Sequence, residues 1–133
     1  LWGSAYYVNN PVYPLAKTVA NINIDGINPI GEAKDLTITG LGHSEMDALA
    51  TAVAKEQGRY VQSDPEPEKG YFYRSDHFNF AHGGVPALYA AGGYEHATKG
   101  KASAQDQRDG FVAQRYLHPA DRDSSSDWPP VGD

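Results

Sequence analysis

Five histidines and one well-placed aspartate are the residues of this 133-residue chain whose types could bind a metal ion. Asp25 ends a segment of alternating apolar and polar residues, and in α/β sheets ligands gather at the carboxyl ends of strands. His118 is followed by Pro119, which stiffens the loop, and the nearby Asp121 can orient its imidazole. A turn at Asp25 and surface or packing roles for the histidines are the competing interpretations. The remaining histidines are His43, His77, His82 and His96.

Several other kinds of chemistry are excluded. The chain has no cysteine, so it has no thiol nucleophile, disulfide or thiolate metal site. It contains neither HExxH nor GxSxG, and the glycines around Leu41 lack the third glycine and the lysine of a phosphate-binding loop. A net charge of -6 argues against nucleic acid or an anionic membrane as a partner. No apolar run reaches the ~18 residues of a membrane span.

The first half of the chain predicts two strands and a helix. Residues 18–25 alternate, with Ala20, Ile22 and Ile24 on one face and Asn21, Asn23 and Asp25 on the other. Residues 36–39 form a second, shorter strand. The apolar stripe of residues 44–57 predicts an amphipathic helix. Ser44 with Asp47 would cap its start, and Gly58 would end it in the left-handed conformation.

The second half is richer in turns. Two prolines make residues 64–70 a stiff connector. We expect a short helix at 75–83, a buried strand at 85–91, a long polar surface loop at 92–110 and a last short helix at 111–117. This order of elements favours an α/β fold, with residues 1–121 as one unit and 122–133 as a loosely held tail.

Five short motifs give the chain a family resemblance. It resembles the carboxyl-terminal half of the catalytic domain of co-catalytic di-zinc aminopeptidases, which are related to glutamate carboxypeptidase, the transferrin receptor and glutaminyl cyclase. The resemblance implies a partial three-layer αβα sandwich with a mixed sheet, like that of zinc exopeptidases. The motifs, in chain order, are Leu1-Trp2-Gly3-Ser4, residues 20–25, residues 73–78, residues 84–88 and His118-Pro119-Ala120-Asp121.

The resemblance also implies a site. In the family two zinc ions share a bridging aspartate and a water, and a glutamate acts as general base. By motif, Asp25 corresponds to the carboxylate ligand of one zinc and His118 to the late histidine ligand of the other. Ser75, Asp76 and His77 correspond to the turn beside the substrate pocket. Tyr73 or Tyr71 corresponds to a phenol that faces the oxyanion.

Two departures from the family pattern bear on activity. The family's late histidine is separated from the proline by one residue, whereas Leu117 holds that position here and His118 adjoins Pro119. The family's first histidine, bridging aspartate and Glu-Glu pair come before the segment that matches Leu1-Trp2-Gly3-Ser4. We therefore expect a fragment of a zinc-dependent peptidase that binds zinc weakly and is inactive alone.

Further expectations concern partners and location. The parent would act on peptide substrates, and the family suggests a periplasmic or secreted protein. A non-catalytic binding or dimerisation module on the same scaffold is the alternative function, and an unrelated small sugar- or peptide-binding domain is a third. A sheet that lacks part of its strands would leave an unpaired edge, so we expect the chain to associate with itself.

Overall fold

A four-stranded mixed sheet organises the part of the chain that the computed structural model describes, residues 1–25 and 30–115. The strands lie in the order β1-β4-β2-β3. β1 pairs with β4 in parallel, β4 with β2 antiparallel, and β2 with β3 in parallel. The expected α/β fold with a mixed sheet is therefore confirmed. The strand bounds are Asn21–Asn23 for β1, Asp35–Thr39 for β2, Tyr60–Ser63 for β3 and Ala87–Ala91 for β4.

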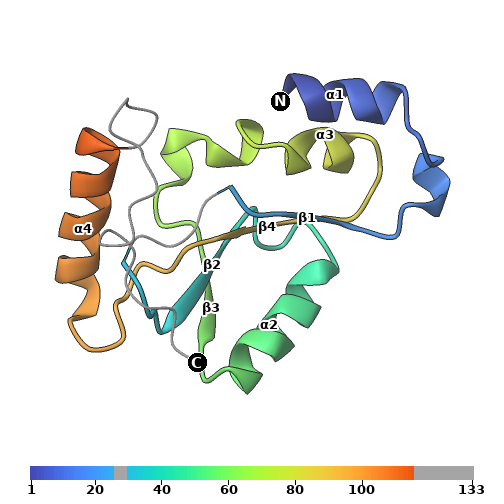
Figure 1. The fold of residues 1–133 in the computed structure, drawn as a ribbon. Helices are drawn as coiled ribbons and strands as arrows, with labels where there is room; N and C mark the ends of the chain where they lie inside the picture. Colours follow the sequence, from blue (N-terminus) through green and yellow to red (C-terminus); the bar gives the residue numbers. More distant parts are fainter. Residues whose placement is uncertain (26–29, 116–133) are drawn as a thin grey trace.

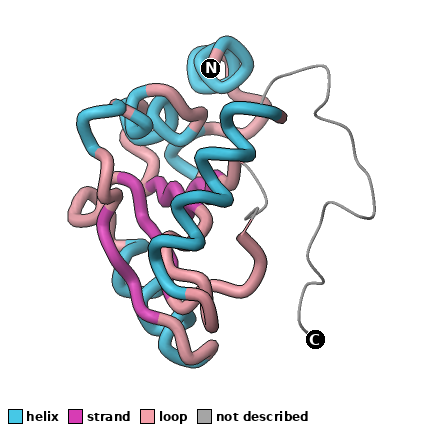
Figure 2. Tube along the Cα trace, turned by 90° about the vertical axis from the view of Figure 1, so that its left-hand side faces the viewer, coloured by secondary structure: helices cyan, strands magenta, loops and turns pink. Residues whose placement is uncertain are grey.

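Helices lie on both faces of this sheet, which gives the three layers (Figure 1). α3 (His77–His82) packs on β1 and β4, and α1 (Trp2–Asn9) packs on α3. α2 (Met46–Glu56) covers the opposite face, against β2, β3 and β4. α4 (Gly100–Gln114) lies nearest the viewer in Figure 2, in front of the strands. Three short 3₁₀ helices complete the described elements: η1 (Leu15–Lys17), η2 (Pro67–Lys69) and η3 (Tyr71–Tyr73).

The strand register decides which side chains face which helix. Asn23 pairs with Tyr89, whose ring contacts His77 of α3, so these two strand residues face α3. Ile22 pairs with Leu88 and therefore faces α2, because successive side chains alternate. The α2 face contains the buried apolar strand residues, Ile38 at 1% and Leu88 at 7% exposed.

The predicted helix of residues 44–57 is confirmed as α2, with both of its end signals in use. Ser44 Oγ accepts the backbone N–H of Met46 at 3.2 Å. Asp47 accepts the N–H of Gly42 at 2.6 Å, so it braces the preceding loop. Gly58 has a φ of +70°, the left-handed conformation expected of the residue that ends a helix.

Three further elements are present with slightly different ends, α3 and β4 shorter than expected and β2 longer by one residue. The helix expected at 75–83 is α3, the strand at 85–91 is β4, and the strand at 36–39 is β2. The strand expected at 18–25 is wrong in its length, and the apolar side of its alternation is exposed. Pairing is confined to β1, and Ile22 and Ile24 are 62% and 68% exposed, because β1 is an edge strand that α2 leaves uncovered.

The long loop expected at 92–110 is wrong, because α4 takes up more than half of that segment. The short helix expected at 111–117 is confirmed only as the last turn of α4, which ends at Gln114, and residues 116 and 117 lie outside the described ranges. The Lys, Gln and Asp residues of α4 suggested a loop, but they lie on the solvent side of a helix that buries a narrow stripe. Ala104 is fully buried and joins Ile30 and Ala33 in an apolar cluster. The guanidinium of Arg108 lies 3.5 Å from the centre of the Tyr94 ring, a cation–π contact.

Two elements were not expected from the sequence at all. α1 has no side-chain cap and places aromatic residues on its solvent side, with Trp2 at 92% exposed. Its other side packs on α3, where the rings of Tyr7 and Phe80 lie 5.7 Å apart. β3 is short, and its pairing with β2 defines it. Within the described ranges no helix is long and apolar enough to cross a membrane.

Candidate functional site

The carboxylate of Asp25 and the hydroxyl of Ser75 meet just beyond the carboxyl end of β1. Ser75 Oγ donates a hydrogen bond to Asp25 Oδ2. Asn23 Nδ2 donates to the other oxygen, Oδ1, at 2.9 Å. Ser75 is buried, whereas Asp25 is exposed. Two neutral donors therefore fix the orientation of a carboxylate that solvent can reach.

The fold explains this meeting of distant residues. α3 packs across β1 and β4, so the residues just before α3 lie over the end of β1. Ser75 is one of these residues, two positions before the first residue of α3. Asn23 and Asp25 share one side of the strand, so their side chains reach each other locally.

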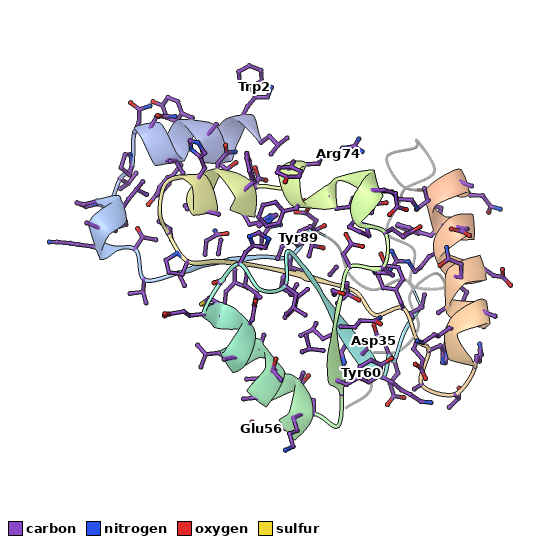
Figure 3. All side chains as sticks on the ribbon, turned by 180° about the vertical axis from the view of Figure 1, so that it is seen from behind. Trp2, Asp35, Glu56, Tyr60, Arg74 and Tyr89 are labelled. Atoms are coloured by element: carbon purple, nitrogen blue, oxygen red, sulfur yellow. The ribbon has the colours of Figure 1, made fainter. Side chains whose placement is uncertain are left out.

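His77 lies in the layer between α3 and the sheet and is 1% exposed. Its ring meets that of Phe72 edge-on at 4.9 Å and that of Tyr89 at 5.0 Å. Figure 3 shows Tyr89 between the sheet and the helical layer above it. Among the described residues neither ring nitrogen has a hydrogen-bond partner. Burial lowers the pKa of His77, although the negative charges of Asp25 and Asp76 act to raise it.

Unpaired buried polar groups cost about 1–3 kcal/mol each, so this histidine is unfavourable for the fold as described. Residues that break packing rules in this way are common at functional sites. His77 is therefore a candidate for a role beyond packing.

Phe72 approaches the chain at Gly40, in the glycine-rich turn that follows β2. Gly40 has a φ of +82°, and a Cβ there would overlap the Phe72 ring. The glycine lets the ring lie against the backbone. The turn thereby positions Phe72 against His77.

Asp76 turns toward α1 rather than toward Asp25. It accepts a hydrogen bond from Ser4 Oγ at 2.5 Å and pairs with the amino group of Leu1 at 2.8 Å. The hydrogen bond from that amino group is the main cause of the lowered pKa of Asp76, and the bond from Ser4 is the next. In this structure Asp76 ties α1 to the start of α3.

Tyr73 lies on the surface and is 65% exposed. Its ring packs edge-on against those of Phe72, at 5.3 Å, and Phe78, at 5.5 Å. Phe72 in turn contacts the ring of His77, and no hydrogen bond joins the Tyr73 hydroxyl to Asp25 among the described residues. Tyr71, the other tyrosine expected near the oxyanion, belongs to the same 3₁₀ helix, η3.

The described residues do not by themselves form a zinc site. His118 and Asp121 lie outside the described ranges. Within those ranges, no group of three or more His, Asp or Glu residues could hold a metal ion. A catalytic zinc needs about three protein ligands. Asp25 can supply one carboxylate, and its immediate neighbours Asn23 and Ser75 are neutral hydrogen-bond donors.

A second polar cluster surrounds the carboxylate of Asp35, which is fully buried. It accepts the backbone N–H groups of Tyr94 and Glu95, at 2.8 and 2.7 Å, and Gln62 Nε2 at 2.6 Å. A Cβ at Gly93 would lie 2.8 Å from Asp35, so the loop after β4 can approach only with glycine there. Charge-assisted bonds of this kind hold that loop firmly.

The other side of this cluster is at the surface. Asp35 and Tyr60 are paired on β2 and β3 (Figure 3). Tyr60 Oη donates to Glu95 at 2.8 Å, and this bond is the main cause that raises the pKa of Tyr60 to about 12. Lys34 also pairs with Glu95, at 3.3 Å.

Sequence reasoning brought Asp25, Ser75 and His77 forward, and the structure places them in one region. It missed three residues. Asn23 could have been found, because the alternation puts it on the same side as Asp25. Tyr89 gave no signal beyond being an aromatic residue in a buried strand. Asp35 comes directly before the strand that we expected at 36–39, and nothing in the sequence indicated that its carboxylate is buried.

Comparison with family models assigns the chain to a family. No curated protein and no solved structure matches the chain significantly. The family model described as peptidase family M28 matches residues 1–130. This match covers nearly the whole sequence and includes Asp25, Ser75 and His77. The chain belongs to peptidase family M28.

Proposed function

We propose that this chain is the carboxyl-terminal part of the catalytic domain of a zinc aminopeptidase, whose intact form removes amino-terminal residues from peptides. Membership of family M28 supports a zinc-dependent peptidase function. The observation that carries the residue assignment is the hydrogen bond from Ser75 to Asp25 at the end of β1. It joins two of the motifs by which the chain resembles the aminopeptidases.

In this proposal Asp25 is the carboxylate that the chain offers to a metal. Ser75 and Asn23 hold its two oxygens, which reduces the freedom that it would lose on binding. His77, whose ring contacts Phe72 and Tyr89, is buried two residues after Ser75. Tyr73 at the surface is the proposed phenol near the oxyanion, and a peptide is the proposed substrate.

We propose that the chain alone is inactive, because its described residues offer too few side chains to bind a catalytic zinc ion. The described residues place no histidine or glutamate within a metal-binding group that includes Asp25. General-base assistance typically contributes 10²–10⁴-fold to a rate, and the resemblance places the family's glutamate base before the segment that matches Leu1-Trp2-Gly3-Ser4. The other ligands and the base would come from elsewhere in the parent.

A non-catalytic module on the same scaffold is the second candidate. Leu117 occupies the position at which the resemblance expects the late histidine, and His118 is displaced by one residue. If His118 cannot serve as a ligand, the parent would lose a metal ligand and keep the fold. Such a protein would bind peptides or partners without hydrolysing them.

Hydrolysis of aminoacyl-p-nitroanilides separates these possibilities. We expect no turnover by the 133-residue chain, and calorimetry should show weak zinc binding without a defined stoichiometry. A longer chain with about 150 preceding residues of the parent, roughly one more domain-sized segment, should show zinc-dependent turnover. His118→Ala should abolish that turnover if the displaced histidine is a ligand.

Each other outcome has a clear meaning. Tight stoichiometric zinc binding by the 133-residue chain would contradict the donor count. A longer chain that folds and binds zinc, yet fails on every aminoacyl substrate, would favour the non-catalytic module. Near-normal turnover of His118→Ala would remove His118 from the ligand set.

A periplasmic or secreted location remains part of the same proposal, because it rests on the resemblance to the bacterial aminopeptidases. Cell fractionation of the parent tests it. Recovery in the cytoplasmic fraction would contradict it.

A further inference from the structure

α4 is held by loops rather than by strands or other helices. Among the described elements, no strand and no other helix packs closely on it. Ala104, which is fully buried, clusters with Ile30 and Ala33 in the loop before β2. Arg108 lies one turn further along α4, on the same side, and its guanidinium is 3.5 Å from the centre of the Tyr94 ring. α4 is therefore anchored on the loop before β2 and on the loop after β4.

These two loops are joined to each other through Asp35. Its fully buried carboxylate accepts the N–H groups of Tyr94 and Glu95, at 2.8 and 2.7 Å. A backbone bond continues the contact, from the N–H of Lys34 to the carbonyl of Glu95 at 2.9 Å. Because these bonds are made away from water and two of them go to a charged acceptor, the loop after β4 is firmly fixed to the start of β2.

Tyr94 connects the buried carboxylate to α4. Its N–H binds Asp35, while its ring faces Arg108. The residue is half-buried, and this burial raises the pKa of Tyr94 to about 12, so the phenol stays neutral. The contact with Arg108 is therefore a cation–π contact rather than an ion pair. Contacts run without a break from the carboxylate of Asp35 through Tyr94 to α4.

The order of the chain relates these contacts to the proposed site. Only residues 26–29 separate Asp25 from Ile30, at the start of the loop before β2. α4 ends at Gln114, and residues 115–117 lead from it to His118. Asp25 and His118 are the two residues proposed as zinc ligands. The position of α4 relative to the loop before β2 therefore bears on the distance between them.

We propose that Asp35 and Tyr94 are positioning residues for the metal site of the parent. Asp35 fixes the loop after β4, and the Tyr94 ring fixes α4 on that loop, so α4 has one position relative to the segment that follows Asp25. Packed contacts of this kind can couple two distant parts of a protein. This role rests on the proposed function, in which Asp25 and His118 bind zinc. The docking of α4 itself can be measured in the 133-residue chain.

Amide hydrogen exchange of the 133-residue chain tests this docking. Tyr94→Leu and Arg108→Gln should each speed exchange in α4 about fivefold, the factor that one cation–π contact contributes, and leave exchange in α2 unchanged. Tyr94→Phe keeps the ring and should exchange like the wild type. Lys101→Gln is the matched control, because it removes an exposed cation from the same helix, and it should change nothing. Unchanged exchange in α4 of both Tyr94→Leu and Arg108→Gln would overturn the proposal.

Asp35→Asn tests the first contact of the series. It should speed exchange in α4 more than in α2, because the loop that holds α4 loses its anchor. Ile38→Ala is the matched control on the same strand: Ile38 is also buried but faces α2, so exchange in α2 should speed up at least as much as in α4. Gln62→Leu removes one donor to Asp35 and is the milder variant if Asp35→Asn does not fold. The same ratio of effects on α4 and α2 in all three variants would overturn the role of Asp35.

Zinc titration of the longer chain tests the positioning role. Tyr94→Leu should weaken zinc binding about 2–30-fold, the range for residues that connect two sites, and Tyr94→Phe should bind zinc like the wild type. Faster exchange in α4 of Tyr94→Leu with unchanged zinc affinity would overturn the positioning role and leave the proposed function intact. A wild-type longer chain that binds no zinc would overturn both, and exchange would still decide whether Tyr94 docks α4.

Discussion

Ser75 donates a hydrogen bond to Asp25 across 50 positions of sequence. One residue precedes a helix and the other follows a strand, and the packing of α3 on β1 brings them together. The bond links the carboxylate proposed as a metal ligand to the turn proposed to line the substrate pocket. It is the contact on which the functional interpretation depends.

Ser75→Ala should therefore act on both stability and metal binding. Loss of the bond should lower the free energy of unfolding of the 133-residue chain by about 1 kcal/mol, a usual net value for one hydrogen bond. In the longer chain the affinity for zinc should fall about 10–100-fold, as it does when the partner of a metal ligand is removed. Denaturant unfolding and zinc titration measure the two effects.

Ser63→Ala on β3 is the control for this change, because Ser63 is exposed. The free energy of unfolding of this variant should stay within about 0.5 kcal/mol of the wild-type value. Unchanged zinc affinity in Ser75→Ala would show that the hydroxyl does not position Asp25.

His77→Leu should leave the fold as stable as the wild type or stabilise it. Both ring nitrogens are buried and lack partners among the described residues, so an apolar side chain of similar size removes an unfavourable feature. In the longer chain the same change should impair turnover if His77 serves the site. A free energy of unfolding that falls by more than about 2 kcal/mol in this variant would show that the imidazole has a stabilising partner.

The stability of the chain should fall as the pH drops below about 6.5. Burial lowers the pKa of His77 from its ordinary value of 6.5. The unfolded chain then binds a proton at a higher pH than the folded chain, so stability is complete above 6.5 and declines as the pH falls toward the folded value. Unfolding curves at several pH values should show a shallower decline in His77→Leu than in the wild type. Identical slopes would contradict this assignment.

Asp35→Asn should be among the most destabilising single changes. The carboxylate accepts two backbone N–H groups and the Gln62 amide while fully buried. The amide of asparagine keeps one acceptor oxygen and places an NH₂ group against these donors. This change should lower the free energy of unfolding by about 2–3 kcal/mol. Denaturant unfolding measures this, with Asp106→Asn, on the exposed side of α4, as the control. Equal stability of the two variants would show that the cluster does not hold the loop.

The elements with a strong local signal could be predicted from the sequence. α2 has the capping residue Ser44 and Gly58 at its end, and both work as local physics predicts. Its apolar stripe marked the helix, but Leu49 and Val53 in that stripe are 64% and 52% exposed. β2, α3 and β4 were found for similar reasons, with ends that differ by a few residues. Asp25 and Ser75 were found because residue type and position marked them.

The remaining parts depend on contacts between distant segments. α4 buries little more than Ala104 and a few neighbours, so its polar composition gave no helical stripe. β3 exists as a strand because β2 pairs with it. The exposed side of Ile22 and Ile24 could not be foreseen, since alternation shows that a strand has two sides and not which of them is covered. The buried carboxylate of Asp35 likewise depends on the loop after β4.

The identity of Asp25 as a ligand can be tested most directly in the longer chain, by measuring zinc content and aminoacyl-p-nitroanilide turnover together. Asp25→Ala should lose zinc and all measurable turnover, because a ligand at the end of a strand cannot be replaced by a flexible neighbour. Asp47→Ala, which removes a carboxylate that binds the N–H of Gly42 near the start of α2, should keep both. Full zinc content and near-normal turnover in Asp25→Ala would contradict the account.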